Sequence, residues 1–241
     1  MSKNVFDIKG ELLSNAYPGR GIIFGRTLDN KQNVVAYFIM GRSENSRNRV
    51  FVETEDGIRT EAYDPSKMTD PSLIIYHPVR QCGGKLVVTN GDQTDTICEY
   101  LREGKSYIDA LRTREFEPDA PNYTSRISGV INEDGSYSLS ILKNFTSDRT
   151  SNKRFFYEYD KPVPGLGHFI HTYQCDGDPL PPFRGEPKCI RIEKPIKQFT
   201  EMLWTSMNEQ NKVALFVRYI DLATGAYWQE IRNKHEEGKK A

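Results

Sequence analysis

Short apolar and polar alternations, separated by Gly, Asn, Asp and Pro, run along most of the chain and are typical of antiparallel strands joined by tight turns. Gly21–Arg26 and Val34–Met40 flank the turn-rich sequence Leu28–Asn33 and predict a first hairpin. A second hairpin is predicted over Ile127–Ile131 and Tyr137–Leu142. Further strands are expected at Val50–Thr54, Ile58–Ala62, Leu73–Tyr76, Lys85–Thr89, Arg154–Tyr159, Gly167–Tyr173, Val213–Tyr219 and Tyr227–Ile231.

Apolar residues also recur at helical spacing in two places. One helical region extends from Ile97 to Leu111, and Ser106 with Asp109 forms a capping pair that would restart a helix inside it. Pro195–Asn208 predicts an amphipathic helix, and residues 1–16 predict a short helix or arm. Because strands cluster before and after a helical middle, the fold class is α+β with two sheets.

Composition and charge narrow the function. Lys and Arg together number 33, as do Asp and Glu, so no global basic field recruits nucleic acid, and any anion site must be local. No apolar run approaches the roughly 20 residues that span a membrane. The N-terminal sequence is polar and lacks a signal-peptide core, so we expect a cytoplasmic protein.

Cysteine and histidine spacing argues against a metal or a disulfide framework. The cysteines lie far apart without a CxxC pair, which favours free thiols in a reducing compartment, and Cys98 is expected in the core rather than as a nucleophile. His168 and His171 have unequal parity on one predicted strand and so face opposite sides. We expect no metal and no cofactor. The cysteines are Cys82, Cys98, Cys175 and Cys189.

Arginines mark the first hairpin and the segment after it. Arg20 and Arg42 each follow a glycine, which lets backbone and guanidinium approach a ligand closely. Planar guanidinium groups suit phosphate and carboxamide oxygens. The alternative is a solvated strand edge whose charges deter aggregation. The arginines are Arg20, Arg26, Arg42, Arg47 and Arg49.

A second motif, Thr89–Ile97 (TNGDQTDTI), ends a strand and opens a helix. Unpaired backbone N–H groups at a helix start can bind an anion or a carbonyl. Asp92 and Asp95 would repel a phosphate there and suit ribose hydroxyls or an amide better. The alternative is a helix cap without a ligand.

A third motif, Glu115–Arg126 (EFEPDAPNYTSR), lies on a loop between a helix and a strand. Glu117 follows the apolar Phe116, and desolvation would raise the pKa of its carboxyl toward the range in which it exchanges protons near neutrality. The alternative is a solvated acidic loop. His77, beside Tyr76, is either a proton relay or a structural strand histidine.

Taken in order, the stretches YPGRGIIFGRTLDNKQNVVAYFIMGRSENSRNR, NGDQTDTI and FEPDAPNYTSRI resemble the single-function IMP cyclohydrolase family first recognised in archaea. The resemblance covers about residues 17–175. From about Pro179 the chain departs from the archaeal pattern, and its PPFRGEP loop, helix and two strands look like an elaboration of bacterial relatives. We therefore expect one domain over residues 1–241.

The resemblance implies a four-layer αββα sandwich like that of the N-terminal nucleophile hydrolases. It also implies closure of 5-formamidoimidazole-4-carboxamide ribonucleotide to IMP, with release of water and without a cofactor. The family pattern makes Glu117 the proton shuttle, Tyr76 the oxyanion donor and Arg42 the electrostatic stabiliser or anchor. An arginine that archaeal members carry near the position of Phe38 is absent here. The expected substrate contacts are Arg20, Arg26, Asn90, Gly91, Asp95, Asn122 and Arg126.

Two other functions stay open at this point. A non-catalytic purine-nucleotide sensor would keep the arginines without the chemistry. An amide hydrolase of the same layered fold would need a terminal nucleophile after processing, and no Ser, Thr or Cys near Met1-Ser2-Lys3 is positioned for that role. The strand-rich layered domain is also expected to form a homo-oligomer.

Overall fold

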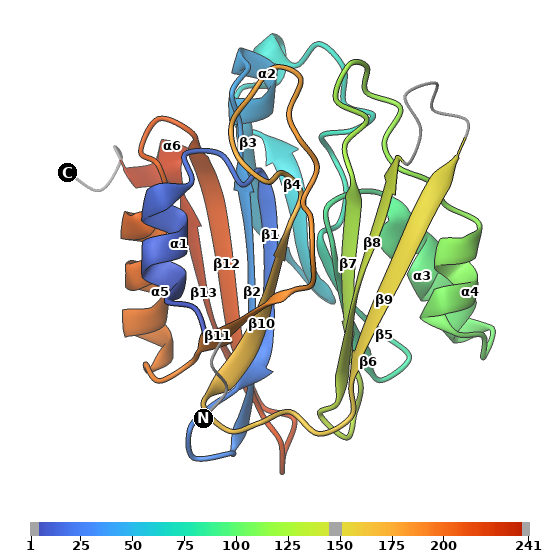
Figure 1. Ribbon diagram of the computed structural model, residues 1–241, viewed down its shortest axis with the longest axis vertical. Coiled ribbons are helices and arrows are strands. Elements are labelled where there is room, and N and C mark those ends of the chain that lie inside the picture. The colour runs from blue at the N-terminus through green and yellow to red at the C-terminus, as the bar shows by residue number, and fades with distance from the viewer. Residues whose placement is uncertain (1–4, 145–150, 238–241) are drawn as a thin grey trace.

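In the computed structural model, which describes residues 5–144 and 151–237, two antiparallel sheets face each other (Figure 1). The first has six strands in the order β11-β10-β1-β2-β12-β13 and the second has seven in the order β3 to β9. The bounds of the first sheet are β1 Arg20–Arg26, β2 Gln32–Met40, β10 Leu166–His171, β11 Lys188–Arg191, β12 Lys212–Asp221 and β13 Tyr227–Asn233. Those of the second are β3 Arg49–Thr54, β4 Gly57–Ala62, β5 Val79–Cys82, β6 Lys85–Thr89, β7 Arg126–Ile131, β8 Tyr137–Asn144 and β9 Asn152–Tyr159.

Helices cover the outer face of each sheet, which makes the molecule layered (Figure 1). On the six-stranded sheet these are α1 (Ile8–Ser14) and α5 (Ile196–Ser206). On the seven-stranded sheet they are α3 (Gln93–Arg102) and α4 (Tyr107–Arg112). The short elements α2 (Glu44–Arg47), η1 (Pro65–Lys67) and α6 (Lys234–Glu237) lie at the sheet ends or the chain end.

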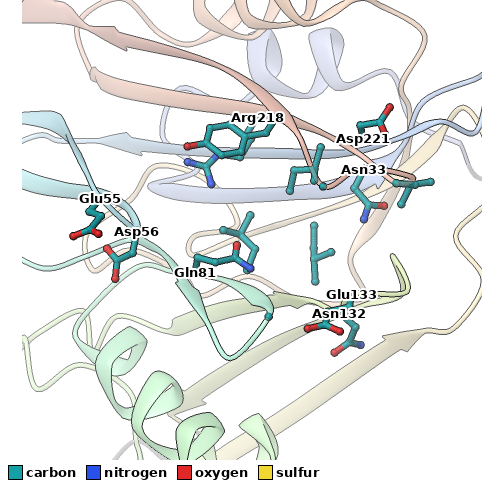
Figure 2. A pocket seen from close by; sticks show the side chains of 15 residues that line it. Asn33, Glu55, Asp56, Gln81, Asn132, Glu133, Arg218 and Asp221 are labelled. Atoms are coloured by element: carbon teal, nitrogen blue, oxygen red, sulfur yellow. The ribbon is translucent and has the colours of Figure 1, made fainter.

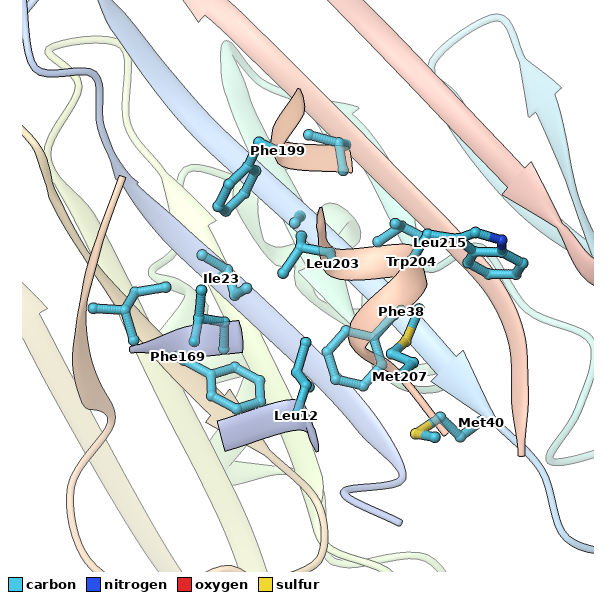
Figure 3. Close-up of a cluster of buried hydrophobic side chains, with 14 of the residues drawn as sticks. Leu12, Ile23, Phe38, Met40, Phe169, Phe199, Leu203, Trp204, Met207 and Leu215 are labelled. Atoms are coloured by element: carbon cyan, nitrogen blue, oxygen red, sulfur yellow. The ribbon is translucent and has the colours of Figure 1, made fainter. Parts of the chain in front are cut away.

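Three buried apolar clusters hold these layers together, since burial of apolar surface is the main favourable term in folding. In Figure 3, Leu12 of α1 and Phe199 and Leu203 of α5 pack over Ile23 and Phe38 of the six-stranded sheet. The second cluster fills the space between the sheets, and the third lies under α3 and α4. Because both faces of the inner strands are covered, β2 is buried from Val34 to Met40.

The sandwich has two ends that differ in what they carry. At one, the far end, lie the β1–β2, β3–β4, β5–β6, β7–β8 and β12–β13 turns. The opposite end, the site end, carries the start of β1, the end of β2, α2, the loop before β7 and the segment after β10. Functional side chains from both sheets can therefore meet at either end.

Most elements predicted from periodicity are confirmed, including both hairpins and the Ser106 cap, whose hydroxyl accepts the N–H of Asp109. The predicted strand Leu73–Tyr76 is wrong. This segment is a turn, because Ile74 and Ile75 both donate to the carbonyl of Pro71. The short strands β5 and β11 were not predicted, since four residues carry too little alternation to stand out.

The expectation of free thiols is wrong for one pair. Cys82 at the end of β5 and Cys98 on α3 form a disulfide, with 5.4 Å between their Cα atoms. They meet because α3 packs across the outer face of β5 and β6 and brings buried residues 16 positions apart together. Cys175 and Cys189 are free.

We expect His171 to make the fold acid-sensitive. Its ring is 1% exposed, and its Nδ1 lies 2.8 Å from the carbonyl oxygen of Tyr173. Burial lowers the pKa of His171 to about 3, so the unfolded chain binds a proton below the ordinary pKa of 6.5 before the folded chain does. The free energy of unfolding therefore decreases as the pH falls from 6.5 toward about 3.

The test is urea unfolding of the wild type and of His171→Asn, whose amide keeps a donor near the Nδ1 position without titrating. From about pH 7 to about pH 4 the wild type should lose roughly 3 kcal/mol more unfolding free energy than the variant. Parallel pH profiles of the two proteins would contradict a buried neutral His171.

Candidate active site

A buried ion pair between the two sheets lies at the centre of the site end. Nη2 of Arg20, the first residue of β1, is 3.3 Å from Oε2 of Glu117, which belongs to the loop before β7 of the other sheet. Their side chains are 11% and 2% exposed. Burial raises the pKa of Glu117, although Arg20 and Arg126 act against it. Burial alone would lower the pKa of Arg20, but Glu117 and nearby phenols raise it well above its ordinary value.

The loop that carries Glu117 is held by its own hydrogen bonds. Glu117 N–H donates to the carbonyl of Thr124 at 2.8 Å, and Asp119 accepts from both the backbone N–H and the hydroxyl of Thr124. The Thr124 hydroxyl also contacts the hydroxyl of Tyr173, which follows β10. The loop is thereby fixed to the six-stranded sheet, and Glu117 is fixed with it.

Two phenols meet beside the ion pair. The hydroxyl groups of Tyr37 and Tyr76 are 2.8 Å apart, and both phenols raise the pKa of Arg20. The Thr60 hydroxyl accepts the N–H of Tyr76 at 2.9 Å and so fixes the turn that carries it. Burial raises the pKa of Tyr37 well above 10, so Tyr37 stays protonated and can donate to Tyr76.

Further guanidinium groups surround this centre. Arg49, 2% exposed, donates from Nε to the Ser46 carbonyl at 2.8 Å, and burial lowers its pKa while the phenols of Tyr76 and Tyr37 raise it. Arg126 donates from Nη1 to Asp92 and Gln93, both at 2.7 Å.

Around the ion pair, Nε of Arg20, Nε of Arg126 and Oγ of Ser125 are buried and have no hydrogen-bond partner within the described part of the chain. Unpaired buried polar atoms are unusual in folded proteins. They are groups that a polar ligand could satisfy.

Gly91 is needed where it stands for a steric reason. A Cβ at this position would fall 2.6 Å from Nη1 of Arg126 and 3.5 Å from Oε1 of Glu117. A residue without a side chain lets the Arg126 guanidinium approach the end of β6 without a clash, whereas the Glu117 carboxyl would be in ordinary contact.

The structure thus brings together Arg20, Tyr76, Gly91, Glu117 and Arg126 from the predicted set. Arg42 and Asn122 lie at the rim. Arg42 pairs with Asp176 at 2.7 Å and stacks over Tyr17, which in turn stacks on Tyr173, while Asn122 accepts the N–H of Leu180 at 3.0 Å.

The other predicted contacts are placed differently. Asn90 is completely buried, and its amide bonds Ser125, Ile127 and Gln93 within the protein. Asp95 pairs with Arg80 at 2.8 Å. Arg26 lies at the far end, where it donates to the Gly135 carbonyl at 3.0 Å. Arg26 is apart because β1 runs the length of the sandwich between it and Arg20.

Sequence reasoning missed Tyr37, Arg49 and Tyr173 as members of the site end. Tyr37 is hidden in the continuous apolar run of β2, and such a run gives no parity signal to show which face a residue takes. Arg49 was noted only as one of several arginines. Tyr173 lies at the end of a predicted strand, where the Thr172 and Tyr173 backbone N–H groups bond Arg20 and Pro18.

Comparison with known proteins identifies the family. The model of the IMP cyclohydrolase-like protein family matches residues 17–225. The chain belongs to that family. The IMP cyclohydrolase of Methanococcus aeolicus is 29% identical over 166 residues, which cover 66% of this chain and 75% of that protein. The Methanopyrus kandleri enzyme is 27% identical over 162 residues, covering 65% and 75%, and the Halobacterium salinarum R1 enzyme is 30% identical over 131 residues, covering 53% and 63%.

The unfolding free energy of this IMP cyclohydrolase-like chain should depend on pH through the titration of Glu117. Because the folded pKa is raised, both states are protonated below the ordinary value of 4.5. As the pH rises, the unfolded chain ionises first, so stability is lost until the folded carboxyl ionises too. Urea unfolding between about pH 4 and pH 8 should show the wild type losing stability relative to Glu117→Gln.

Glu115→Gln is the matched control, since Glu115 is an exposed carboxylate two residues away. Its pH profile should follow that of the wild type. A Glu117→Gln profile that also runs parallel to the wild type would mean that Glu117 keeps an ordinary pKa.

Proposed function

We propose that this chain closes 5-formamidoimidazole-4-carboxamide ribonucleotide to IMP and releases water. Family membership and relatives named IMP cyclohydrolase support the reaction. One observation assigns the reaction to these residues: Glu117 is a carboxyl with a raised pKa, 1% exposed, and it pairs with Arg20, which also interacts with the phenol pair.

The reaction needs a proton carrier and charge stabilisation. The carboxamide nitrogen bonds to the formyl carbon and loses one proton, and the formamide nitrogen loses a second. The former formyl oxygen takes up these two protons, and its C–O bond breaks to give water. Glu117 can take and return a proton because burial raises the pKa of its carboxyl, which makes the neutral form more accessible than it is in water. Tyr76 donates to the oxygen as negative charge develops on it, and Arg20 stabilises the same charge. Holding the two reacting groups in contact supplies much of the acceleration.

The other predicted residues, and Arg49, have secondary roles or none. Arg126, Arg49 and the backbone at Gly91 bind polar groups of the nucleotide, with the unpaired Nε of Arg126 as one donor. Arg42, 37% exposed at the rim, anchors the 5′-phosphate by exchanging Asp176 for it. Asn122 positions the rim, Asn90 and Asp95 support the frame, and Arg26 takes no part.

We also infer that the layered arrangement is related to the N-terminal nucleophile hydrolase fold. Two facing antiparallel sheets with helices outside support this relation. Ser2, on which an amide hydrolase would depend, lies outside the described residues. No helix in the described ranges is long and apolar enough to cross a membrane. Four expectations stay predictions: a single domain with an elaboration from about residue 179, a bacterial origin, a cytoplasmic location and a homo-oligomer.

The direct test adds the formylated ribonucleotide to purified protein and follows the appearance of purine absorbance. The wild type should turn over, and Glu117→Gln should lower kcat on the order of 100-fold or more, with KM nearly unchanged, because only proton transfer is lost.

The control Glu115→Gln should keep the wild-type rate, since that carboxylate is exposed on the same loop. Unchanged turnover in Glu117→Gln would remove Glu117 from the mechanism. Nucleotide binding by calorimetry without turnover in the wild type would instead favour the sensor.

Substitutions should distinguish Tyr76, which donates a hydrogen bond to the substrate oxygen, from Tyr37, which positions Tyr76. Tyr76→Phe should lower kcat on the order of 100-fold, as loss of an oxyanion donor does. Tyr37→Phe should lower kcat only about fivefold to tenfold, the value of one neutral hydrogen bond, with KM unchanged. The double variant should be no slower than Tyr76→Phe, because Tyr37 acts through Tyr76. Additive losses would contradict this order.

A further inference from the structure

A cavity of about 450 Å³ opens between the sheets at the far end, away from the ion pair at the site end (Figure 2). Its walls come from β2, the β3–β4 turn, the β5–β6 hairpin, the β7–β8 turn and the β12–β13 turn. This volume falls within the range of small-molecule pockets. Its floor is apolar and consists of Leu86, Ile131, Ile220 and Leu222.

A buried amide whose oxygen has no partner in the described ranges lines this cavity. Asn33 of β2 is 3% exposed, and its Oδ1 has no hydrogen-bond partner within the described ranges. In Figure 2 the amide extends from its strand toward the space between the sheets, on the side of Asn132 and Glu133. An unsatisfied buried carbonyl costs free energy, which a ligand N–H would recover.

Carboxylates surround the same opening. The lining contains the acidic residues Glu55, Asp56, Glu133 and Asp221 and one basic residue, Arg218. Asp56 is neutralised by Arg80 at 2.7 Å. Arg218 is turned to its own wall, where it donates to Gln229 at 2.6 Å and stacks on Tyr227 with 4.0 Å to the ring centroid. The opening therefore favours a cation over an anion.

The acidic groups are spread around the cavity rather than gathered. In the described part of the chain no three His, Cys, Asp or Glu side chains are placed to hold one metal ion. Glu55 and Glu133 come from different turns, and Asp221 ends β12, where its Oδ1 accepts the N–H groups of the turn that follows. A ligand that meets more than one of them must extend across the apolar floor.

We propose that the far-end cavity binds a small aliphatic amine, whose methylene chain covers the apolar floor while its ammonium groups meet the rim carboxylates and the Asn33 carbonyl. This site is separate from the proposed active site and does not rest on the proposed reaction.

The test uses three probes of one length: 1,5-diaminopentane, 1,5-pentanediol and glutarate. Calorimetry on the full chain should show saturable binding of the diamine, one per chain, and none of the diol or the dianion. The dissociation constant should rise with salt, because the contact is between opposite charges. Diamine binding no tighter than that of glutarate would overturn the proposal.

Variants locate the site. Asn33→Leu and Glu133→Gln should each weaken diamine binding at least fivefold, and thermal unfolding checks that each variant folds. Glu133 is exposed on a turn, so its variant keeps the test valid if Asn33→Leu does not fold. Glu99→Gln, an exposed carboxylate on α3, is the control and should bind like the wild type. Equal binding by Glu133→Gln and Glu99→Gln would place the diamine elsewhere and overturn the proposal, whatever the result for IMP formation.

Discussion

The organisation of the site end depends on burying Arg20 and Glu117 against each other where the two sheets meet. Removing one partner of a buried pair typically costs about 3–5 kcal/mol, since the other charge is then left without compensation. The same burial is what raises the pKa of Glu117. At 3.3 Å, Arg20 favours the charged form of Glu117, while burial, the larger effect, favours the neutral form.

Sheet packing sets this separation, because the two residues belong to different sheets. β1 carries Arg20, and the loop before β7 carries Glu117. The contact between the Thr124 and Tyr173 hydroxyls and the bond from Leu180 to Asn122 join that loop to the segment after β10. The apolar cluster between the sheets therefore acts on the chemistry indirectly, since a shift of one sheet against the other would change the Arg20–Glu117 distance.

The sequence predicts the frame better than the site, for physical reasons that differ from residue to residue. Alternating apolar and polar residues around turn residues predict a hairpin, so the β1–β2 and β7–β8 hairpins could be predicted. Leu73–Tyr76 was mistaken for a strand because four apolar residues look alike in a strand and in a buried turn. Glu117 could be chosen because its loop resembles the family pattern, while its position after Phe116 alone also fits a solvated acidic loop. Tyr37 could not, because β2 is buried on both faces and all its residues look like core. The Cys82–Cys98 contact depends on how α3 crosses the sheet, which local sequence does not encode.

The polar motif after β6 shows how a sequence can mark a site without its residues forming the contacts expected of them. The Asn90 amide hydrogen-bonds Ser125, Ile127 and Gln93, and Asp92 accepts from Arg126. Gln93 in turn accepts from Arg126. These side chains orient one guanidinium, and Gly91 leaves the space that this guanidinium occupies. A motif of this kind positions functional groups that other elements carry. The residues that can be recognised in the sequence are therefore not the residues that act on the substrate.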